Sequence, residues 1–504
     1  GDDMSTLVST QVTTLVSTQV TTLVSTKSGP VQGVVKDDVL LFSGIPYAAP
    51  PTGARRFQAA QPHPGWREVR DATRFGKAAP QLVTGGMTGS VPVRWDEDCL
   101  FLNIATPAAD DQKRPVFFWI HGGAYRTGQG AVPWYNGTQF AKNGDVVTVS
   151  INYRLGALGF TDLSRFGADY ATSGLNGILD QIVALEWVRD NIEKFGGDPD
   201  QITIGGESAG GFSVCTLLGS PRAQGLFQRA ISQSGGAQHT LSKAAGKIVA
   251  DAFLTTLDVG DMTGLLALSA DAILEAQRKV DAEMAADMNA RLDGVSAFYP
   301  VEGSAVLPRS PLLTIQDGIS ADVPVMTGTN KDEATLFLMG KSDAKKLSRL
   351  ADSYGGGEAL IAAYRQLYPD ASTTELSIAL WTDHSFRVPA LRLAEARLNS
   401  NNTWMYLFSW ESRAAHLKST HALEIPFVFD NLNKPGVGLF IGPGESPQAL
   451  ADIMHAAWIA FIRTGDPGWP AYDLASRQTM VFDTTSGLQD DPDAGKHDAW
   501  ATIR

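Results

Sequence analysis

Residues 201–215 read Gln-Ile-Thr-Ile-Gly-Gly-Glu-Ser-Ala-Gly-Gly-Phe-Ser-Val-Cys. A short β-branched run leads into Gly206-Glu207-Ser208-Ala209-Gly210, and a helix-forming stretch follows. A serine hydroxyl becomes an effective nucleophile when it projects from a sharp strand-to-helix turn towards a base and oxyanion donors. The flanking glycines let such a turn close without Cβ clashes. The stretch therefore predicts a nucleophile elbow with Ser208 at its tip.

The five-residue pattern is not specific by itself. Glycine supplies 50 of the 504 residues. A chance Gly-x-Ser-x-Gly is therefore expected roughly 0.3 times in such a chain. A catalytic role for Ser208 requires the remaining groups of a site elsewhere in the sequence.

Composition and charge narrow the class of protein. With 43% hydrophobic residues, a chain of 504 residues can bury a large core, in one α/β domain or in two or three smaller ones. The 41 basic and 54 acidic residues give a net charge of −13, which argues against nucleic acid or anionic membrane as a partner. No apolar stretch approaches the roughly 20 residues of a membrane helix. The oligomeric state is left undetermined.

The N-terminus carries a tandem octapeptide repeat. Residues 5–12 (STLVSTQV) recur as 13–20 (TTLVSTQV) and, shortened, as 21–26 (TTLVST). The alternation suits an extended strand, but three copies are too few for a solenoid. We expect a peripheral tail over 1–28, in the form of an added edge strand, and one large catalytic domain over 29–504. No basic-then-apolar signal peptide is present; the start at Gly1 is compatible with removal of a leader, which favours export over the cytoplasm and leaves the compartment open.

From residue 29 onward, strand-like apolar runs alternate with helical periods. Such alternation predicts βαβ units on a mostly parallel sheet, that is, an α/β protein. The expected strands are 117–120, 146–151, 202–204, 323–327 and 403–408. The expected helices are 181–195 and 448–463, the latter ending at Gly465, and 251–289 is expected to form helical cover over the site.

A glycine pair follows the expected strand 117–120, in the string His121-Gly122-Gly123-Ala124-Tyr125. Backbone N–H groups in such a loop can face a substrate oxygen and form an oxyanion hole. The predicted donors are the N–H groups of Gly123, Ala124 and Ala209. We expect His121 to hold this loop in place rather than to act as the base.

The general base is expected late in the chain, because the order in α/β-hydrolases is nucleophile, acid, histidine. Among the histidines after Ser208, His421 stands on a loop before an apolar segment and is the preferred base. His416 is its nearest rival and is interpreted as a solvated loop residue. His455 falls within the expected helix 448–463, where packing or surface exposure is favoured.

Two carboxylates follow the expected strand 323–327, where the acid of a triad stands. Glu333 is preferred and Asp332 is the close alternative on chemistry alone. The acid would hold the imidazole in the tautomer that accepts the serine proton, and would stabilise the imidazolium.

The two cysteines, Cys99 and Cys215, exclude a disulfide framework. Cys215 is interpreted as a buried packing residue in the helix after Ser208. No metal-ligand spacing is present, which disfavours zinc hydrolysis.

Several strings together resemble one family. They include 42–51 (FSGIPYAAPP), 97–103 (EDCLFLN), 152–156 (NYRLG), 195–199 (FGGDP) and 421–427 (HALEIPF), besides the loop at 121 and the elbow. Over residues 30–483 the chain resembles a type-B carboxylesterase of the cholinesterase/carboxylesterase superfamily, in the pattern of bacterial p-nitrobenzyl-type esterases.

The resemblance implies an α/β-hydrolase fold and assigns the site. Ser208 is the implied nucleophile, Glu333 rather than Asp332 the acid and His421 the base, with the same three oxyanion donors. Ser234 matches a serine that supports the triad acid by hydrogen bonding, with a structural serine as the alternative.

Two features depart from the family pattern. The cysteine of the 97–103 string forms a disulfide in animal members, but no cysteine precedes Cys99 here, so we expect a buried thiol. The N-terminal repeat has no counterpart in the family.

The sequence therefore predicts a serine carboxylic-ester hydrolase that forms an acyl-enzyme and needs no cofactor. Arg126 is a candidate to bind a carboxylated acyl group, against the favoured alternative of a salt bridge or carbonyl contact that holds the loop. Trp134 and Tyr135 are candidates for an aromatic pocket wall, with core packing equally expected. The competing functions are a catalytically silent binding module, which would lack triad residues, and a lipase, which would need a large apolar lid.

Overall fold

The computed structural model describes residues 22–82, 91–285, 292, 294–338 and 340–503. The first two copies of the N-terminal repeat lie outside these residues. The remainder of the last copy forms β1 (Leu23–Thr26), which pairs antiparallel with β2 (Gly29–Gln32); β2 also pairs with β5 (Arg70–Asp71). These three strands form a small sheet separate from the main one. The division into a tail over 1–28 and a domain over 29–504 stays a prediction.

An 11-stranded mixed sheet forms the centre of the described chain, in the order β14-β13-β12-β11-β10-β9-β7-β8-β6-β4-β3. In this order, the strands from β13 through β7 to β8 run parallel. The pairings at both ends of the sheet are antiparallel. In chain order the strands are β3 (Val34–Lys36), β4 (Val39–Pro46), β6 (Phe101–Thr106), β7 (Arg114–Ile120), β8 (Val147–Ile151), β9 (Gly197–Glu207), β10 (Arg229–Gln233), β11 (Val325–Asn330), β12 (Thr403–Phe408), β13 (Gln478–Phe482) and β14 (Gly487–Asp490).

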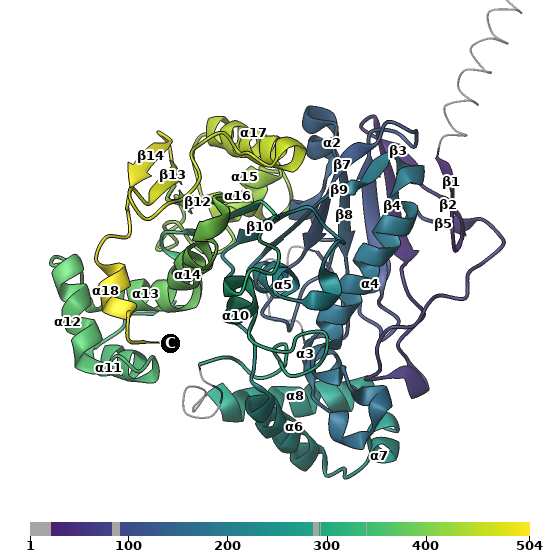
Figure 1. Cartoon of the computed structure of the whole chain (residues 1–504), viewed down its shortest axis with the longest axis horizontal. Helices are drawn as coiled ribbons and strands as arrows, with labels where there is room; N and C mark the ends of the chain where they lie inside the picture. The colour runs from purple at the N-terminus through teal and green to yellow at the C-terminus, as the bar shows by residue number, and fades with distance from the viewer. Residues whose placement is uncertain (1–21, 83–90, 286–291, 293, 339, 504) are drawn as a thin grey trace, which may run out of the picture.

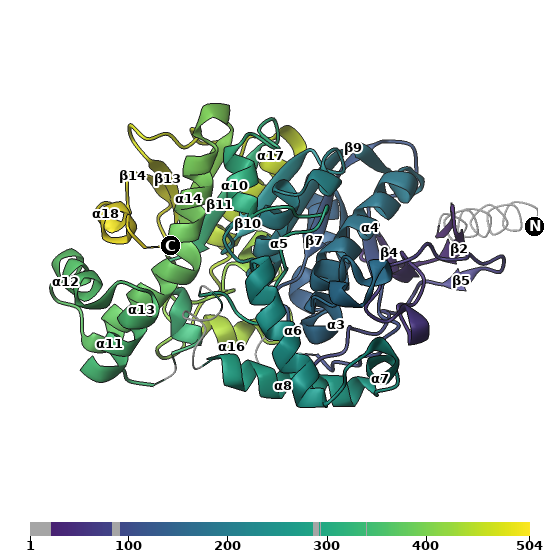
Figure 2. The same cartoon turned by 60° about the horizontal axis from the view of Figure 1, so that its bottom comes forward.

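Helices pack on both faces of this sheet. They are α2 (Thr138–Gly144), α3 (Gly156–Phe160), α4 (Asn176–Asn191), α5 (Ala209–Leu218), α6 (Lys243–Leu257), α7 (Met262–Leu266), α8 (Ala270–Ala285), α10 (Pro311–Gln316), α11 (Ala344–Ser353), α12 (Gly357–Leu367), α13 (Thr373–Thr382), α14 (Val388–Ala396), α15 (Ile425–Val428), α16 (Val437–Ile441), α17 (Gln448–Thr464) and α18 (Lys496–Trp500). Figure 1 shows α6–α8 grouped at the bottom of the molecule and α11–α13 with α18 on the left. Figure 2 shows the same two groups with the molecule turned.

The core explains why the strands read as continuous apolar runs. All seven residues of β7 are buried, because helices cover both of its faces. Phe118 and Ile120 belong to the hydrophobic cluster that contains α4 and α5, whereas Phe117 and Trp119 belong to the cluster that contains α17. Alternate side chains of one strand therefore fill two cores.

The predicted elements are present with shifted bounds. The strand 403–408 is confirmed, but β11 begins at Val325 instead of 323, and β9 is much longer than 202–204. Helix α4 begins at Asn176 instead of 181, and α17 ends at Thr464 before Gly465, whose φ of 80° makes it a left-handed C-cap. The cover expected over 251–289 is formed by α6, α7 and α8, and its residues 286–289 lie outside the described chain.

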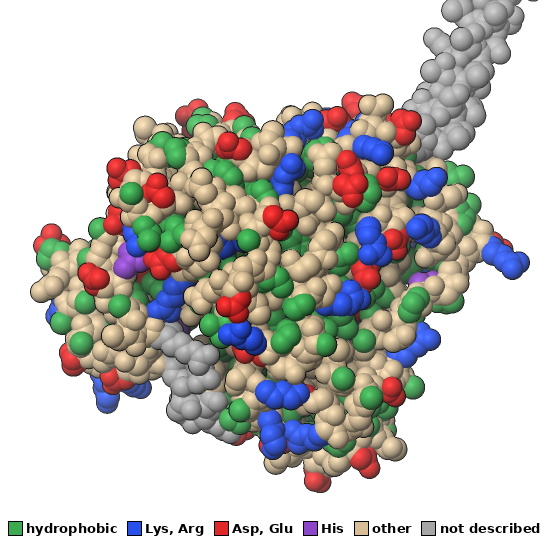
Figure 3. Space-filling view, viewed as in Figure 1, with side chains coloured by type: hydrophobic (Ala, Val, Ile, Leu, Met, Phe, Trp, Pro, Cys, Tyr) green, Lys and Arg blue, Asp and Glu red, His purple; other side chains and the backbone are tan. Residues whose placement is uncertain are grey.

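The surface and the helix lengths bear on the expected partners. Acidic and basic side chains are interspersed over the face seen in Figure 3. Within the described ranges, no helix combines the length and apolar character that crossing a membrane would demand.

Candidate active site

Ser208 stands between the last residue of β9 and the first residue of α5, with φ 59° and ψ −122°. Its N–H donates to the carbonyl oxygen of Gln233 at 3.0 Å. A Cβ at Gly206 would lie 2.4 Å from the backbone of Gly210, and a Cβ at Gly210 would lie 2.0 Å from the Ile120 oxygen. Only glycine fits at these two positions, so the sharp turn and its strained serine follow from the sequence of the elbow.

The glycine loop after β7 lies against this elbow. A Cβ at Gly122 would lie 3.1 Å from the Ser208 Cβ and 2.4 Å from the Glu207 carbonyl oxygen. Gly123 and Ala124 both have positive φ, at 126° and 56°, which turns the backbone N–H groups out of the usual strand direction. No group of the described chain accepts a hydrogen bond from the N–H of Gly123, Ala124 or Ala209. These three donors are free to bind an oxyanion, and Ala209 adds the positive end of α5.

His121 lies beneath the loop and is buried. Its Nδ1 donates to the Gly122 carbonyl oxygen at 2.8 Å, and its ring stacks on Tyr153 with the centroids 4.5 Å apart. The Tyr153 hydroxyl donates to the His121 carbonyl oxygen at 2.6 Å. Burial lowers the pKa of His121 to about 4, so the ring is neutral at neutral pH. These contacts fix the loop and leave His121 outside the cavity lining.

His421 and Glu333 are brought together from loops that are 88 residues apart in sequence. His421 Nδ1 donates to Glu333 Oε1 at 2.9 Å, and the Ser234 hydroxyl donates to the same oxygen at 2.8 Å. Glu333 is fully buried. Asp332 instead turns away, and its carboxylate accepts the N–H of Ser419 at 3.3 Å.

The second nitrogen of His421 faces another carboxyl group. Nε2 lies 3.2 Å from Oε2 of Glu207, which directly precedes Ser208. Burial acts to lower the pKa of His421, but Glu207 and Glu333 outweigh burial and raise this pKa to about 9. His421 is thus held on both edges of its ring by carboxyl groups.

Two further glutamates of the site had no assigned role at the level of sequence. Burial raises the pKa of Glu207 and of Glu424. The neighbouring carboxyl groups raise both pKa values further. The Glu424 carboxyl group accepts from Gln233 Nε2 at 2.9 Å and from Asn330 Nδ2 at 3.0 Å. Both lie within quoted motifs, Glu207 inside the elbow and Glu424 three residues after His421, and that adjacency was the available signal.

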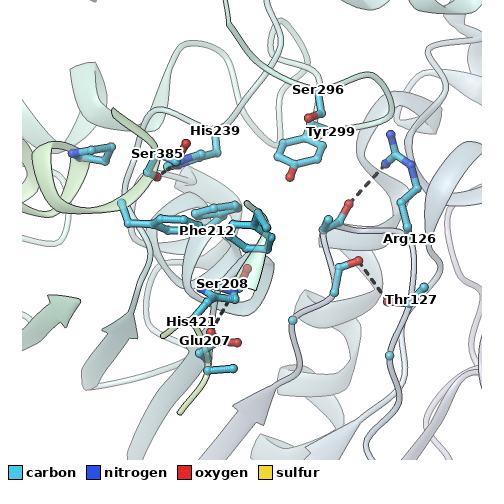
Figure 4. Close-up of a pocket in the computed structure, with 18 of the residues that line it drawn as sticks. Arg126, Thr127, Glu207, Ser208, Phe212, His239, Ser296, Tyr299, Ser385 and His421 are labelled. Carbon is cyan, nitrogen blue, oxygen red and sulfur yellow. Dashed lines mark hydrogen bonds and ion pairs between the residues drawn. The ribbon is translucent and has the colours of Figure 1, made fainter. Parts of the chain in front are cut away.

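The site opens into a cavity of about 1560 Å³. Ser208, Glu207 and His421 lie together in Figure 4, with Phe212, His239 and Ser385 along the adjoining wall. A π-helical segment (Asp383–Arg387) between α13 and α14 carries Ser385 and Phe386 into this wall. The Phe386 ring lies 4.9 Å from the imidazole of His421. The cavity is therefore aromatic next to the reactive groups.

Trp134 and Tyr135 line the cavity and are also buried in the hydrophobic cluster around α17. Trp134 Nε1 donates to the Pro435 carbonyl oxygen at 2.8 Å. The two residues thus combine the wall position and the core packing that the sequence left as alternatives.

Arg126 lines the cavity, but its guanidinium is engaged by the chain itself. It forms a bidentate ion pair with Asp281 on α8, at 2.6 and 2.7 Å. It also donates to the carbonyl oxygens of Ala297 and Phe298 and, at 3.4 Å, of Ala124. The geometry is that of the loop-holding arginine favoured from sequence, and a role in binding a carboxylated acyl group stays a prediction.

The remaining candidates lie away from the cavity. His416 is exposed on its loop. His455 is buried in α17, where Nδ1 contacts the Val428 oxygen at 2.7 Å. Cys99 and Cys215 are free and buried.

Comparison with known proteins identifies the class. The family model described as "Carboxylesterase family" matches residues 20–500. The para-nitrobenzyl esterase of Bacillus subtilis (strain 168) is 37% identical over 93% of this chain and 96% of its own length. The phenmedipham hydrolase of Pseudarthrobacter oxydans is 35% identical over 90% and 93%, respectively.

A solved structure agrees with these relatives. The Geobacillus stearothermophilus carboxylesterase superposes with a TM-score of 0.85 at 39% identity and covers 95% of this chain and 100% of that one. The predicted α/β-hydrolase fold and family are confirmed, and neither a silent binding module nor a lipase is favoured. The chain belongs to the carboxylesterase family and is a carboxylic-ester hydrolase.

Proposed function

We propose that the enzyme hydrolyses small to medium carboxylic esters through an acyl-enzyme on Ser208. His421 Nε2 takes the hydroxyl proton while Ser208 Oγ attacks the ester carbonyl carbon. The tetrahedral oxyanion accepts hydrogen bonds from the N–H groups of Gly123, Ala124 and Ala209. Each such donor typically contributes about 3 kcal/mol to barrier lowering.

The second half of the cycle reverses the proton transfers. The C–O bond of the ester breaks, and the alcohol leaves with the proton from His421 Nε2. Water then donates a proton to His421 as its oxygen attacks the acyl carbon, and the carboxylic acid leaves as Ser208 regains its proton. Glu333 stabilises the imidazolium in both halves, and Ser234 orients Glu333.

The observation that carries this proposal is the 2.9 Å contact between Glu333 Oε1 and His421 Nδ1 beside the serine elbow. A carboxylate at Nδ1 leaves Nε2 as the nitrogen that can accept a proton, which is the tautomer that a serine base requires. In the described state Glu207 faces Nε2, and it adds negative charge that favours the imidazolium.

The cavity supports substrates that carry an aromatic group. Phe212, Phe337 and Phe386 line it near His421, and two relatives carry names that refer to a para-nitrobenzyl ester and to phenmedipham. We therefore propose neutral aromatic esters as preferred substrates, with carboxylated acyl groups as the further class.

A substrate panel tests the mechanism. Hydrolysis of 4-nitrophenyl acyl esters of increasing chain length is measured on the wild type and on Ser208→Ala. The variant is expected to lose at least about 10³-fold in kcat. The acyl-enzyme would appear as a burst of 4-nitrophenol in the wild type, and full activity of the variant would refute the role of Ser208.

A further inference from the structure

Three arginines line the cavity among the described residues, and they differ in their partners. Arg126 is paired with Asp281. Arg278, on the same helix as Asp281, is paired with Glu275 at 2.7 Å. Arg392 on α14 forms no ion pair with any described residue.

The contacts of Arg392 are all with neutral oxygens. Nη2 donates to the carbonyl oxygens of Trp500 at 3.0 Å and Ile503 at 2.5 Å, and Nη1 contacts Gln238 Oε1 at 3.4 Å. A guanidinium has five N–H donors. The Nε–H and the second Nη1–H of Arg392 therefore have no acceptor in the described part of the chain.

The carboxylate nearest in sequence is already engaged. Glu395, three residues along α14, pairs with Arg477 and with His497, each at 3.0 Å. Burial lowers the pKa of Arg392, and the negative charge of Glu395 offsets this effect only in part. Neutral oxygens solvate such a charge only in part, whereas an anion offsets it directly.

The position of Arg392 relates it to the reacting groups. Phe386, whose ring lies 4.9 Å from His421, precedes Arg392 by six residues in a continuous helical segment. At the rise of an α-helix, the backbone positions of Phe386 and Arg392 are about 9 Å apart along the axis of this segment. In the same wall of the cavity, His239 stacks on Phe212 and donates from Nε2 to the Ser385 oxygen at 3.0 Å (Figure 4).

The neighbouring histidines reinforce the contrast in charge. Burial lowers the pKa of His239 and of His384 to about 4, so both rings are neutral at neutral pH. Both line the cavity. Arg392 therefore contributes a positive charge to a part of the cavity wall in which the two histidines are neutral.

We infer that Arg392, with the amide of Gln238, forms a subsite for a carboxylate carried by the acyl group of the substrate, because both residues line the cavity into which Ser208 opens. The substrate class is then a hemi-ester of a linear dicarboxylic acid, whose free carboxylate pairs with Arg392 while its ester carbonyl lies at Ser208. The inference rests on the proposed catalytic role of Ser208.

The test compares matched pairs of substrates. kcat/KM is measured for 4-nitrophenyl hemi-esters of dicarboxylic acids from succinic to sebacic, each against the ester of the monocarboxylic acid of equal length. In the wild type the ratio of carboxylated to neutral ester is expected to reach a maximum at one chain length, the length at which the carboxylate reaches Arg392. Arg392→Gln is expected to lower that peak ratio about tenfold, mainly through KM, while Arg392→Lys retains most of it.

Arg278→Gln is the matched control, because it removes the same charge from another arginine along the same cavity. It is expected to leave the ratio within about twofold. A flat ratio in the wild type, an equal effect of the two glutamine variants, or an equal loss on neutral and carboxylated esters in Arg392→Gln would overturn the subsite. The last result would make Arg392 a clamp for the C-terminal segment only.

Two measurements keep these outcomes separate. If Arg392→Gln fails to fold, the wild-type length series and Arg392→Lys decide the question. Ser208→Ala distinguishes the two levels of the proposal, since its loss of activity on both ester types supports the mechanism whatever the ratio shows.

Discussion

Nε2 of His421 lies 3.2 Å from Oε2 of Glu207, the residue that immediately precedes the candidate nucleophile. Glu207, the residue before the nucleophile turn, therefore also adds a carboxyl group beside the base His421. A protonated His421 cannot accept the serine proton, so activity falls as the pH drops through the pKa of His421.

Glu207→Gln is expected to shift the acidic limb of kcat/KM to lower pH. Glu207 raises the pKa of His421, and the neutral amide removes that contribution. The pKa of His421, and with it the acidic limb, is therefore expected to fall by about one pH unit. A pH profile from 5 to 10 measures this. Glu358→Gln, at an exposed position on α12, is the control and should leave the limb in place. An unmoved or upward-shifted limb in Glu207→Gln would contradict the assignment.

Glu333→Gln is expected to lower kcat by about 10³- to 10⁴-fold with little change in KM, because the amide no longer holds the imidazole in its accepting tautomer. Asp332→Asn serves as the matched control, since this carboxylate contacts Ser419 and not His421. It should stay within about threefold of the wild type. Steady-state kinetics on one neutral ester suffices, and the reverse order of effects would make Asp332 the acid.

Ser234→Ala is expected to lower kcat about tenfold, the equivalent of one lost hydrogen bond of about 1.4 kcal/mol. The bond in question is the 2.8 Å donation to Glu333 Oε1. Ser232→Ala removes a buried hydroxyl from β10, the strand that directly precedes Ser234; the Ser232 hydroxyl donates to the Gly211 oxygen at 3.1 Å. Thermal unfolding of both variants checks for a purely structural effect. Equal losses of kcat in the two variants would reject a positioning role for Ser234.

Arg126→Leu is expected to reduce kcat about tenfold on neutral and carboxylated esters alike. The substitution releases the oxyanion loop from Asp281 and from the Phe298 carbonyl oxygen. Asp281→Asn should show the same pattern in weaker form. A loss confined to carboxylated esters would instead show that Arg126 reads the substrate.

Ser208 and Glu333 could be predicted because each belongs to a local motif that follows a strand, and His421 because it stands on a loop before an apolar segment. The glycines around Ser208 predict the turn directly. The apolar run 403–408 likewise predicts β12 with the bounds that the structure shows. The start of β9 was missed because Gly197–Asp200 is polar and glycine-containing, and lacks the apolar signal of a strand. Its place in the sheet comes from pairing with β7 rather than from local preference.

Contacts between distant segments could not be predicted from a single sequence. Asp281 meets Arg126 across 155 residues, and both Arg392 and Glu424 acquire their surroundings only when several loops converge. No periodicity or spacing within either segment encodes the partner. The contacts of Arg126, which decide between a substrate-binding and a loop-holding arginine, therefore depend on tertiary packing.

The order of adjacent strands in the middle of the sheet fixes the spacing of the catalytic groups. The glycine loop, Ser208, Ser234 and Glu333 follow β7, β9, β10 and β11, which are successive neighbours. Neighbouring strands are about 4.8 Å apart, and a one-residue slip turns every side chain to the opposite face. Inserting or deleting one residue within these strands would disrupt catalysis, whereas positions on the wall helices that hold no loop of the site can change. New ester preferences can thus be acquired by changing the walls while the chemistry keeps its spacing.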